Sequence, residues 1–344
     1  MPLPERRSGP APRPSVATLP PPPPGKTGWP WTQESLRLPE RTATGDAWPR
    51  LTVVTPSLNQ GRFIEATIRS ILLQGYPELE YFLIDGGSSD GTREIIAKYE
   101  PWIDFTISEP DRGQSSAINR GLRMGSGSHA TWINSDDMLC QNALFNLFSH
   151  HRLADHVIAV GDCTVIDESG SAIQQHRGAV HSFKDLVRVR EVWYGGGYLC
   201  QPEMLFPLAL ALQVGGLNEN DHYSMDYGLW GELLLAGAAL HYTGLPFGMF
   251  RHHQGQKTKN TSTQIASTLD AAESLITRSH LLSSQEKEEL LTDLRRHRDA
   301  YPEMLWRGSG RLARLGLPRA LVNAIRQFSH PILKSSFLSR GPAE

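Results

Sequence analysis

The sequence contains little cysteine, almost no net charge and no long apolar run. Its 344 residues include three cysteines, far apart and without Cys-x-x-Cys spacing, at positions 140, 163 and 200. That usage excludes a secreted disulfide scaffold and makes a closed zinc site improbable. Lysine and arginine total 34 against 36 acidic residues, a net charge of -2, so nothing in the overall charge attracts nucleic acid.

No segment approaches the ~18 consecutive apolar residues of a membrane-spanning helix. The first residues, MPLPERRSGPAPRPS, place charges and prolines where a signal peptide needs a continuous apolar core. We therefore expect a protein of the reducing cytoplasm, neither exported by that route nor integral to a membrane. Its 39% hydrophobic residues can furnish a globular core.

Residues 1–48 are rich in proline and poor in apolar residues, apart from Trp29, Trp31 and Trp48. A segment of this composition lacks the apolar surface needed to offset the entropy of ordering. We predict a disordered or polyproline-like tail.

From residue 49 to 160, short apolar runs alternate with segments of helical periodicity. The predicted strands are 51–57, 79–85, 102–108, 129–135 and 157–161, and the predicted helices 62–74, 91–99, 115–124 and 142–151. Several runs are too continuously apolar for a sheet with one wet face. The pattern predicts an α/β fold in which a mostly parallel, Rossmann-like sheet is flanked by helices.

Residues 161–258 are less regular and rich in glycine and aromatics, and we interpret them as a binding half built on the same domain. Residues 259–344 have helical patterns and end in a basic segment that includes Arg311 and Arg314. Two interpretations of this segment remain open. It lies on an anionic membrane surface as a peripheral contact, or it forms a helical pair that packs on the domain, because Pro318 and Pro331 interrupt any long amphipathic face.

Polar residues end the predicted strands, where ligands of parallel sheets bind. The candidates are Thr55, Pro56, Ser57 and Asn59 after the first strand, Asp85 and Gly86 after the second, Asp111 and Arg112 after the third, and Asn134, Ser135, Asp136 and Asp137 after the fourth. Taken singly, the first three groups are also explained by ordinary turns, helix caps and surface charge.

The adjacent carboxylates Asp136 and Asp137 are harder to explain by capping alone. One aspartate suffices for a cap, and the second is repelled by the first unless a cation lies nearby. Magnesium or manganese is usually held by one or two carboxylates together with the phosphates of a substrate. The pair therefore predicts a divalent metal, Mn²⁺ or Mg²⁺, and a diphosphate ligand.

Several motifs in order, TPSLNQGRFIEATIRSILLQGYPELEYFLIDGGSSDGT, SEPDRGQSSAINRGL and WINSDDM, resemble the family 2 glycosyltransferases with the GT-A fold over residues 50–255. The resemblance implies an inverting transfer of a sugar, of hexosyltransferase type, from a nucleotide diphosphate sugar to an acceptor hydroxyl. Similar enzymes build cell-surface polysaccharides or lipid-linked glycans. The residues listed above at the strand ends would then bind the donor.

The resemblance also assigns roles within the site. The family's DXD carboxylates resemble Asp136, facing the donor's ribose or sugar, and Asp137, the expected metal ligand, with Asn134 at the usual first position. The segment HYSMDYGLW resembles the family's catalytic-base region and points to Asp226. FRHHQGQKT resembles the family's late Arg-x-His segment, which would place His253 within reach of the metal or the diphosphate. GGGYLCQPEMLF resembles the loop ahead of the acceptor site, where Trp193 and Tyr194 would stack on a sugar and Gln201 and Glu203 would hydrogen-bond its hydroxyls.

Other interpretations remain for several of these residues. Asp226 is also suited to cap a helix, and aromatic packing is an alternative for Trp193 and Tyr194. Many relatives carry a second aspartate where this chain has Gly86, so uridine is favoured by family habit only. A sugar nucleotidyltransferase is disfavoured because TPSLNQGRF lacks a glycine-rich basic loop, and an inactive glycan-binding scaffold remains the non-enzymatic alternative.

Overall fold

The computed structural model describes residues 11–257 and 261–298, which belong to two compact units. The first unit comprises Met1–Arg177 and Cys200–His253, and the second comprises Gly178–Leu199 and Gln254–Glu344. Residues 178–199, predicted as part of the acceptor half, thus group with the helical residues that follow the domain.

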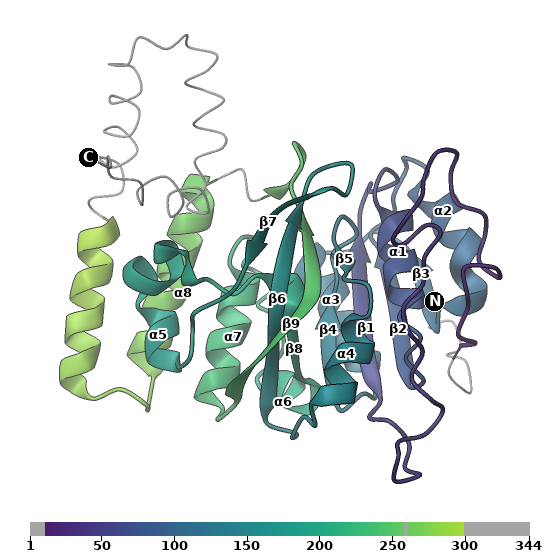
Figure 1. Ribbon diagram of the computed structural model, residues 1–344. Helices are drawn as coiled ribbons and strands as arrows, with labels where there is room; N and C mark the ends of the chain where they lie inside the picture. The colour runs from purple at the N-terminus through teal and green to yellow at the C-terminus, as the bar shows by residue number, and fades with distance from the viewer. Residues whose placement is uncertain (1–10, 258–260, 299–344) are drawn as a thin grey trace, which may run out of the picture. The chain divides into compact units, whose positions relative to one another are not determined.

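The first unit is built on one mixed sheet, which has nine strands in the described residues, in the order β3-β2-β1-β4-β8-β6-β9-β5 with β7 beside β6 (Figure 1). Its parallel half consists of β1 (Leu51–Ser57), β2 (Leu79–Asp85), β3 (Phe105–Ser108) and β4 (His129–Trp132). All seven residues of β1 are buried, as its continuous apolar run predicts for a strand covered on both faces. The predicted α/β fold, a Rossmann-like sheet flanked by helices, is confirmed, and the predicted mostly parallel pairing holds in this half of the sheet.

The other half of the sheet is mixed. It consists of β8 (Met204–Pro207), β6 (Val157–Ile166), β9 (Ala239–Arg251), the two-residue β5 (Met138–Leu139) and β7 (Ala172–His176). β6 and β9 run parallel, whereas β8, β5 and β7 are antiparallel to their neighbours. The long β9 returns the chain to β5, so its last residue, Arg251, arrives beside the Asp136–Asp137 segment.

Helices of the first unit pack on the sheet by their apolar sides. They are α1 (Ile64–Leu72), α2 (Thr92–Tyr99), α3 (Gln114–Met124), α4 (Ala143–His150), α6 (Leu208–Gln213) and α7 (Met225–Leu235), with single turns at η1 (Glu100–Trp102) and η3 (Gln201–Glu203). α3 approaches β1 closely at Gly121, where an added Cβ would lie 2.5 Å from a methyl of Val54. Only glycine permits this approach.

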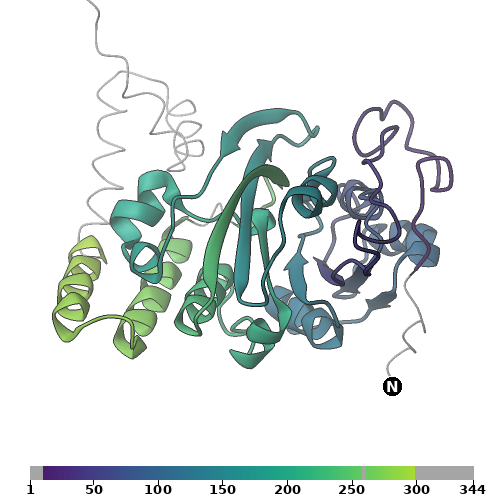
Figure 2. The same ribbon diagram turned by 60° about the horizontal axis from the view of Figure 1, so that its bottom comes forward.

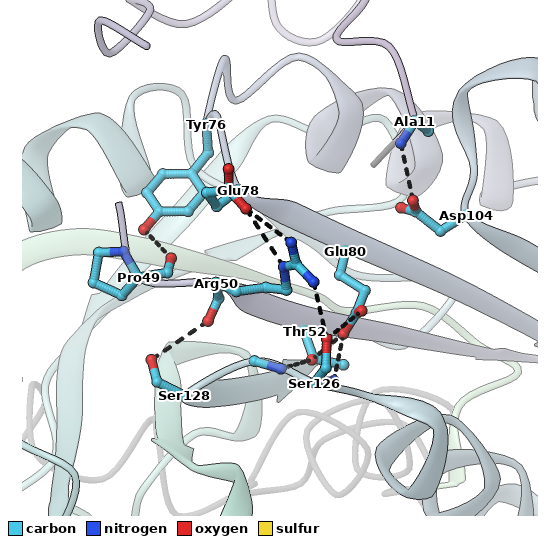
Figure 3. A network of polar contacts seen from close by, with 11 residues as sticks. Ala11, Pro49, Arg50, Thr52, Tyr76, Glu78, Glu80, Asp104, Ser126 and Ser128 are labelled. Atoms are coloured by element: carbon cyan, nitrogen blue, oxygen red, sulfur yellow. Dashed lines mark hydrogen bonds and ion pairs between the residues drawn. The ribbon is translucent and has the colours of Figure 1, made fainter. Parts of the chain in front are cut away.

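The amino ends of the strands are closed by a polar network (Figure 3). The Glu80 carboxylate, 3% exposed, accepts hydrogen bonds from the Thr52 hydroxyl at 2.7 Å and from the amide and hydroxyl of Ser126 at 2.7 and 2.9 Å. Arg50 pairs with Glu78 at 3.2 Å. Buried polar groups are tolerated here because each has a partner.

The predicted disorder of residues 1–48 is wrong for residues 11–48. These residues form no helix or strand, yet Leu19 and Leu38 are each 5% exposed and join the core cluster around Ile68. Figure 2 shows the segment, in dark purple, folded against the domain, where its Pro20 and Pro30 carbonyls accept hydrogen bonds from Arg69 of α1. Composition does not predict this order, because it depends on contacts with the domain. A few apolar side chains of the segment pack in the core, and several of its backbone carbonyls accept hydrogen bonds from Arg69.

The second unit is helical. It contains α5 (Phe183–Val187), the helical segment η2 (Val189–Gly197), α8 (Thr261–Arg278) and helical residues 284–298. Ser182 caps α5, accepting from the Asp185 amide, and Lys184 pairs with Glu286 at 2.6 Å. The basic segment predicted after residue 309 lies outside the described residues. Within 11–257 and 261–298, no helix is long and apolar enough to cross a membrane.

Candidate active site

The carboxyl ends of β1, β2 and β3 meet at one edge of the sheet. Ser57 pairs in register with Asp85, and Asp85 with Ser108, so the last residues of three strands lie side by side. β4 follows on the other side of β1, in register from Leu51↔His129 to Val54↔Trp132. The predicted donor residues after all four strands therefore share this edge.

Asp85 is an organiser of this edge and is itself inaccessible. Its side chain is fully buried, and its oxygens accept hydrogen bonds from the Gly87 and Ser88 amides, the Ser88 hydroxyl and the Ser108 hydroxyl. A carboxylate with this many donors has little capacity left for a ligand. Its predicted contact with the donor is therefore not supported, and it instead shapes the loop that follows β2.

The residues after β1 divide in the same way. Thr55 is fully buried and accepts from the Tyr81 hydroxyl at 3.1 Å, and Pro56 is also buried, so neither predicted donor contact is supported. Asn59 has a left-handed backbone (φ 52°) and accepts from the Ser89 amide at 2.9 Å, which joins this loop to the loop after β2. Ser57 differs from them, because its buried hydroxyl has no hydrogen-bond partner in the part of the chain that the structure describes.

Asp111 and Arg112 are exposed on the loop between β3 and α3. One Asp111 oxygen accepts from the Gly113 amide at 2.7 Å, and the carboxylate lies over Gly86, where an added Cβ would be 3.2 Å from Oδ2. Arg112 pairs with Glu219 at 2.7 Å. The edge therefore brings Gly86 and Asp111 together.

Asn134 links four parts of the site. Its Oδ1 accepts from Gln114 at the start of α3 at 2.7 Å, and its Nδ2 donates to Asp137 and to Gln201, each at 3.2 Å. Its neighbour Ser135 is buried. Sequence reasoning missed Gln114, although its position where a strand-end loop enters a helix was a signal.

Asp137 is buried, with 1% exposure, and both carboxylate oxygens are engaged. Oδ1 accepts from the Arg251 amide at 2.8 Å and Oδ2 from the Asn134 amide group at 3.2 Å. Burial, together with the neighbouring charge of Asp136, raises the pKa of Asp137 well above its ordinary value. This geometry argues against the predicted metal ligand and makes Asp137 a support for the backbone.

Asp136 is the accessible member of the pair. Its carboxylate, 18% exposed, lies 2.9 Å from His253 Nε2. The imidazole packs on the Phe63 ring with centroids 4.7 Å apart, which fixes its direction. An imidazole nitrogen and a carboxylate oxygen thus face each other, and each is a group that can ligate a divalent metal.

Arg251 holds the segment around this pair. The side chain is 3% exposed, and its guanidinium donates to the carbonyls of Asp136 at 2.7 Å and Asp167 at 3.1 Å. These bonds tie the turn after β6 to the Asp136 backbone. The Arg251 guanidinium therefore has a structural role in holding these backbone segments together.

Asp226 lies in the first turn of α7 and accepts from the Tyr227 amide at 2.8 Å. Burial, with a smaller contribution from Asp221, raises the pKa of Asp226 to about 6. The preceding residue, Met225, accepts a hydrogen bond at its sulfur from Ser115 at 2.8 Å, next to the Gln114 that binds Asn134. The start of α3 thus connects Asp226 with the Asp136 segment.

The predicted acceptor residues are less uniform. Gln201 is 8% exposed and donates to the Trp132 carbonyl at 2.6 Å, and Glu203 is fully buried with a pKa raised by burial. Burial argues against the predicted contacts of both with acceptor hydroxyls. Trp193 and Tyr194 belong to the second unit, where Trp193 is 9% exposed and Tyr194 stacks on His297, so their acceptor role stays a prediction.

The site offers a metal few ligands of its own. Among residues 11–257 and 261–298, no group of three or more histidine, cysteine, aspartate or glutamate side chains could hold an ion. The pair Asp136 and His253 fits a cation that completes its coordination with substrate phosphates, as Mg²⁺ and Mn²⁺ do.

The sequence matches a family model and several curated proteins. Residues 52–206 match Glycosyl transferase family 2. The putative teichuronic acid biosynthesis glycosyltransferase TuaG of Bacillus subtilis is 38% identical over 93 residues, which are 26% of this chain and 36% of TuaG. Glycosyltransferase GlyG of Streptococcus pneumoniae is 28% identical over 122 residues, 35% of this chain and 40% of GlyG. The chain thus matches well under half the length of these curated relatives.

Solved structures share the fold. S. aureus TarS superposes with a TM-score of 0.53 at 17% identity, covering 72% of this chain and 43% of that one. TarS residues 1–349 in complex with UDP-GlcNAc give a TM-score of 0.52 at 15% identity, covering 72% of each chain. The sequence match, the fold and the strand-edge site together identify residues 52–206 as a domain of glycosyl transferase family 2, with the GT-A fold.

Proposed function

We propose that this chain is an inverting glycosyltransferase that moves a sugar from a nucleoside diphosphate donor to a hydroxyl of an acceptor glycan. The observation that carries the proposal is the 2.9 Å contact of Asp136 with His253 at the carboxyl edge of the sheet. Two side chains of types that can ligate a metal, 117 residues apart in the chain, meet where ligands of open α/β sheets bind.

Asp136 and His253 would hold Mn²⁺ or Mg²⁺, in place of the Asp137 expected from sequence. Bound there, the cation would stabilise the charge that develops on the leaving diphosphate. Asp137 supports this arrangement, because its hydrogen bonds with the Arg251 amide and the Asn134 side chain fix the backbone next to Asp136.

Ser57, Gly86, Asp111 and Asn134 remain candidates for contact with the donor. The Ser57 hydroxyl is already desolvated and has no partner among the described residues, so a ligand's hydrogen bond there restores what burial removed. Gly86 leaves space in front of Asp111.

Asp226 would take the proton of the acceptor hydroxyl as that oxygen attacks the sugar from the face opposite the leaving group. A base works best when its pKa is close to the working pH. The pKa of Asp226 is raised to about 6, which makes its carboxylate a stronger base than an ordinary aspartate. Because this pKa is still below 7, the carboxylate is mostly ionised at neutral pH.

The relatives suggest the classes of substrate. TuaG is named for teichuronic acid biosynthesis, and TarS was solved with UDP-GlcNAc. We infer a uridine diphosphate sugar as donor and a cell-surface polysaccharide or lipid-linked glycan as acceptor.

The test is Mn²⁺-dependent release of UDP from UDP-GlcNAc, measured by chromatography with and without a chelator. We expect release to require the metal and to fall about 100-fold or more in Asp136→Asn, a loss of the size seen when metal sites are disturbed. Asp155→Asn, a change at an exposed aspartate, serves as the matched control. Release that survives both the chelator and Asp136→Asn would overturn the proposal.

A further inference from the structure

The segment 11–48 is attached to the domain by a buried arginine. Arg69 of α1 is fully buried, and its guanidinium donates to the carbonyls of Pro20, Pro30 and Trp31 at 2.8, 3.0 and 2.8 Å. A buried charge is costly unless polar groups surround it. Three of those groups come from the segment, so α1 and the segment depend on each other.

A second set of contacts runs from the segment to the residues that follow the acidic pair. Trp29 Nε1 donates to the Leu139 carbonyl at 2.9 Å, and the Trp31 ring packs against the small cluster that contains Met138. Ser35 Oγ accepts from the Asn142 amide at 2.8 Å. Met138, Leu139 and Asn142 are thereby contacted by the segment.

α1 contacts the same stretch. Thr67 donates its hydroxyl to the Asp137 carbonyl at 2.6 Å, and Ser70 Oγ accepts from the Leu139 amide at 3.1 Å. β5, only two residues long, has few strand contacts of its own to fix it. The backbone that follows Asp136 is therefore held jointly by α1 and the amino-terminal segment.

We propose that the tryptophan-containing part of the amino-terminal segment, residues 28–36, acts as a positioning element for the Asp136 carboxylate. It lies before residue 52, where the family match begins. Its contribution is to fix the backbone after Asp136, so that this carboxylate and His253 keep the separation that a metal requires. The expected effect on Mn²⁺ affinity rests on the proposed function, whereas the expected effect on the backbone of residues 137–142 does not.

Two tryptophans of the segment provide a matched pair of variants. Trp29→Phe removes the N–H that binds Leu139 and keeps an aromatic ring. Trp48→Phe removes an N–H that binds only Pro39, within the segment itself, at 2.8 Å. Each change replaces an indole with a phenyl ring and deletes one hydrogen bond of the segment. The deleted bond joins the segment to β5 in Trp29→Phe and lies within the segment in Trp48→Phe.

The experiment titrates Mn²⁺ into each full-length protein in the presence of UDP and follows amide hydrogen exchange over residues 137–142. Loss of one hydrogen bond predicts an Mn²⁺ dissociation constant about fivefold higher in Trp29→Phe, and faster exchange at 137–142. Trp48→Phe should match the unmodified protein in both measurements. Thermal melting of each variant reports whether the fold is intact, and Ser35→Ala, which removes a second contact to this stretch, replaces Trp29→Phe if that variant does not fold.

The outcomes separate this inference from the proposed function. Unchanged Mn²⁺ affinity and exchange in Trp29→Phe, in a protein that binds Mn²⁺, overturn the positioning role and leave the function standing. Equal changes in Trp29→Phe and Trp48→Phe overturn it too, because they indicate general loosening of the segment. If the unmodified protein binds no Mn²⁺, the metal site of the proposed function and the positioning role of residues 28–36 are both overturned. Faster exchange in Trp29→Phe alone would then show only that the segment stabilises the backbone of residues 137–142.

Discussion

The two edges of the parallel half-sheet carry similar residues but use them differently. At the amino edge, Glu80 and Thr52 are hydrogen-bonded to each other and to Ser126 and Gly127 (Figure 3). At the carboxyl edge, Asp85 and Asp137 are also fully engaged, but Ser57 has an unpartnered hydroxyl among the described residues and Asp136 faces a histidine. Polar residues at strand ends therefore indicate function only where hydrogen bonding within the protein leaves them capacity.

This difference predicts that changes at carboxyl-edge residues with remaining hydrogen-bonding capacity reduce activity and leave stability unchanged. Changes at the amino edge should do the reverse.

The largest effect is expected at Asp226, which the start of α3 connects with the carboxyl edge. Asp226→Asn keeps the size of the side chain and removes the base, so kcat should fall about 1000-fold, within the range for a lost general base. The melting temperature should stay the same or rise, because a partly buried carboxylate with a raised pKa is removed. A kcat within tenfold of the unmodified enzyme would exclude Asp226 as the base.

At the amino edge the effect should appear in stability. Glu80→Ala leaves the Thr52 hydroxyl and the Ser126 amide without their buried acceptor, which should lower the free energy of unfolding by roughly 3 kcal/mol. Urea denaturation measures this loss, and kcat of the folded fraction should not change. Normal stability with reduced kcat would reverse the assignment of the two edges.

The pH dependence gives a smaller, graded effect. Because the pKa of Asp226 is raised to about 6, the base is ionised above that pH and becomes protonated as pH falls through it. We expect kcat/KM to decline about tenfold per unit below pH 6. The residual activity of Asp226→Asn should lose this dependence, and a decline of the same shape in that variant would point to another group.

The smallest effect is expected at Ser57. Ser57→Ala removes a buried hydroxyl that has no partner among the described residues, so stability should be unchanged or slightly higher. If the hydroxyl binds the donor, KM for UDP-GlcNAc should rise about fivefold with kcat unchanged. An unaltered KM would leave Ser57 as a structural exception at this edge.

Much of the fold was predictable because its signals are local. The apolar runs that became β1, β2, β3 and β4 and the periodic segments that became α1 to α4 each agree with their burial. The motifs at the strand ends also predicted the GT-A fold of family 2. These features depend on neighbouring residues, which a single sequence displays.

The site was less predictable because its contacts are distant in sequence. Asp136 and Asp137 look equivalent in the sequence, and the Arg251 amide, 114 residues away, decides that Asp137 is engaged. Burial of Glu203 follows from the packing of η3 against β6 and β9. Likewise, the order of residues 11–48 depends on Arg69, whose role as a buried donor to carbonyls has no local signature.

The central claim is that Asp136 and His253, rather than Asp137, hold the metal. Electron spin echo envelope modulation of Mn²⁺ bound with UDP detects an imidazole nitrogen ligated to the ion. The account predicts one histidine nitrogen coupling in the unmodified protein and its loss in His253→Gln, with the manganese affinity also lost in Asp136→Asn. A spectrum without nitrogen coupling, or one that His253→Gln leaves unchanged, would contradict it.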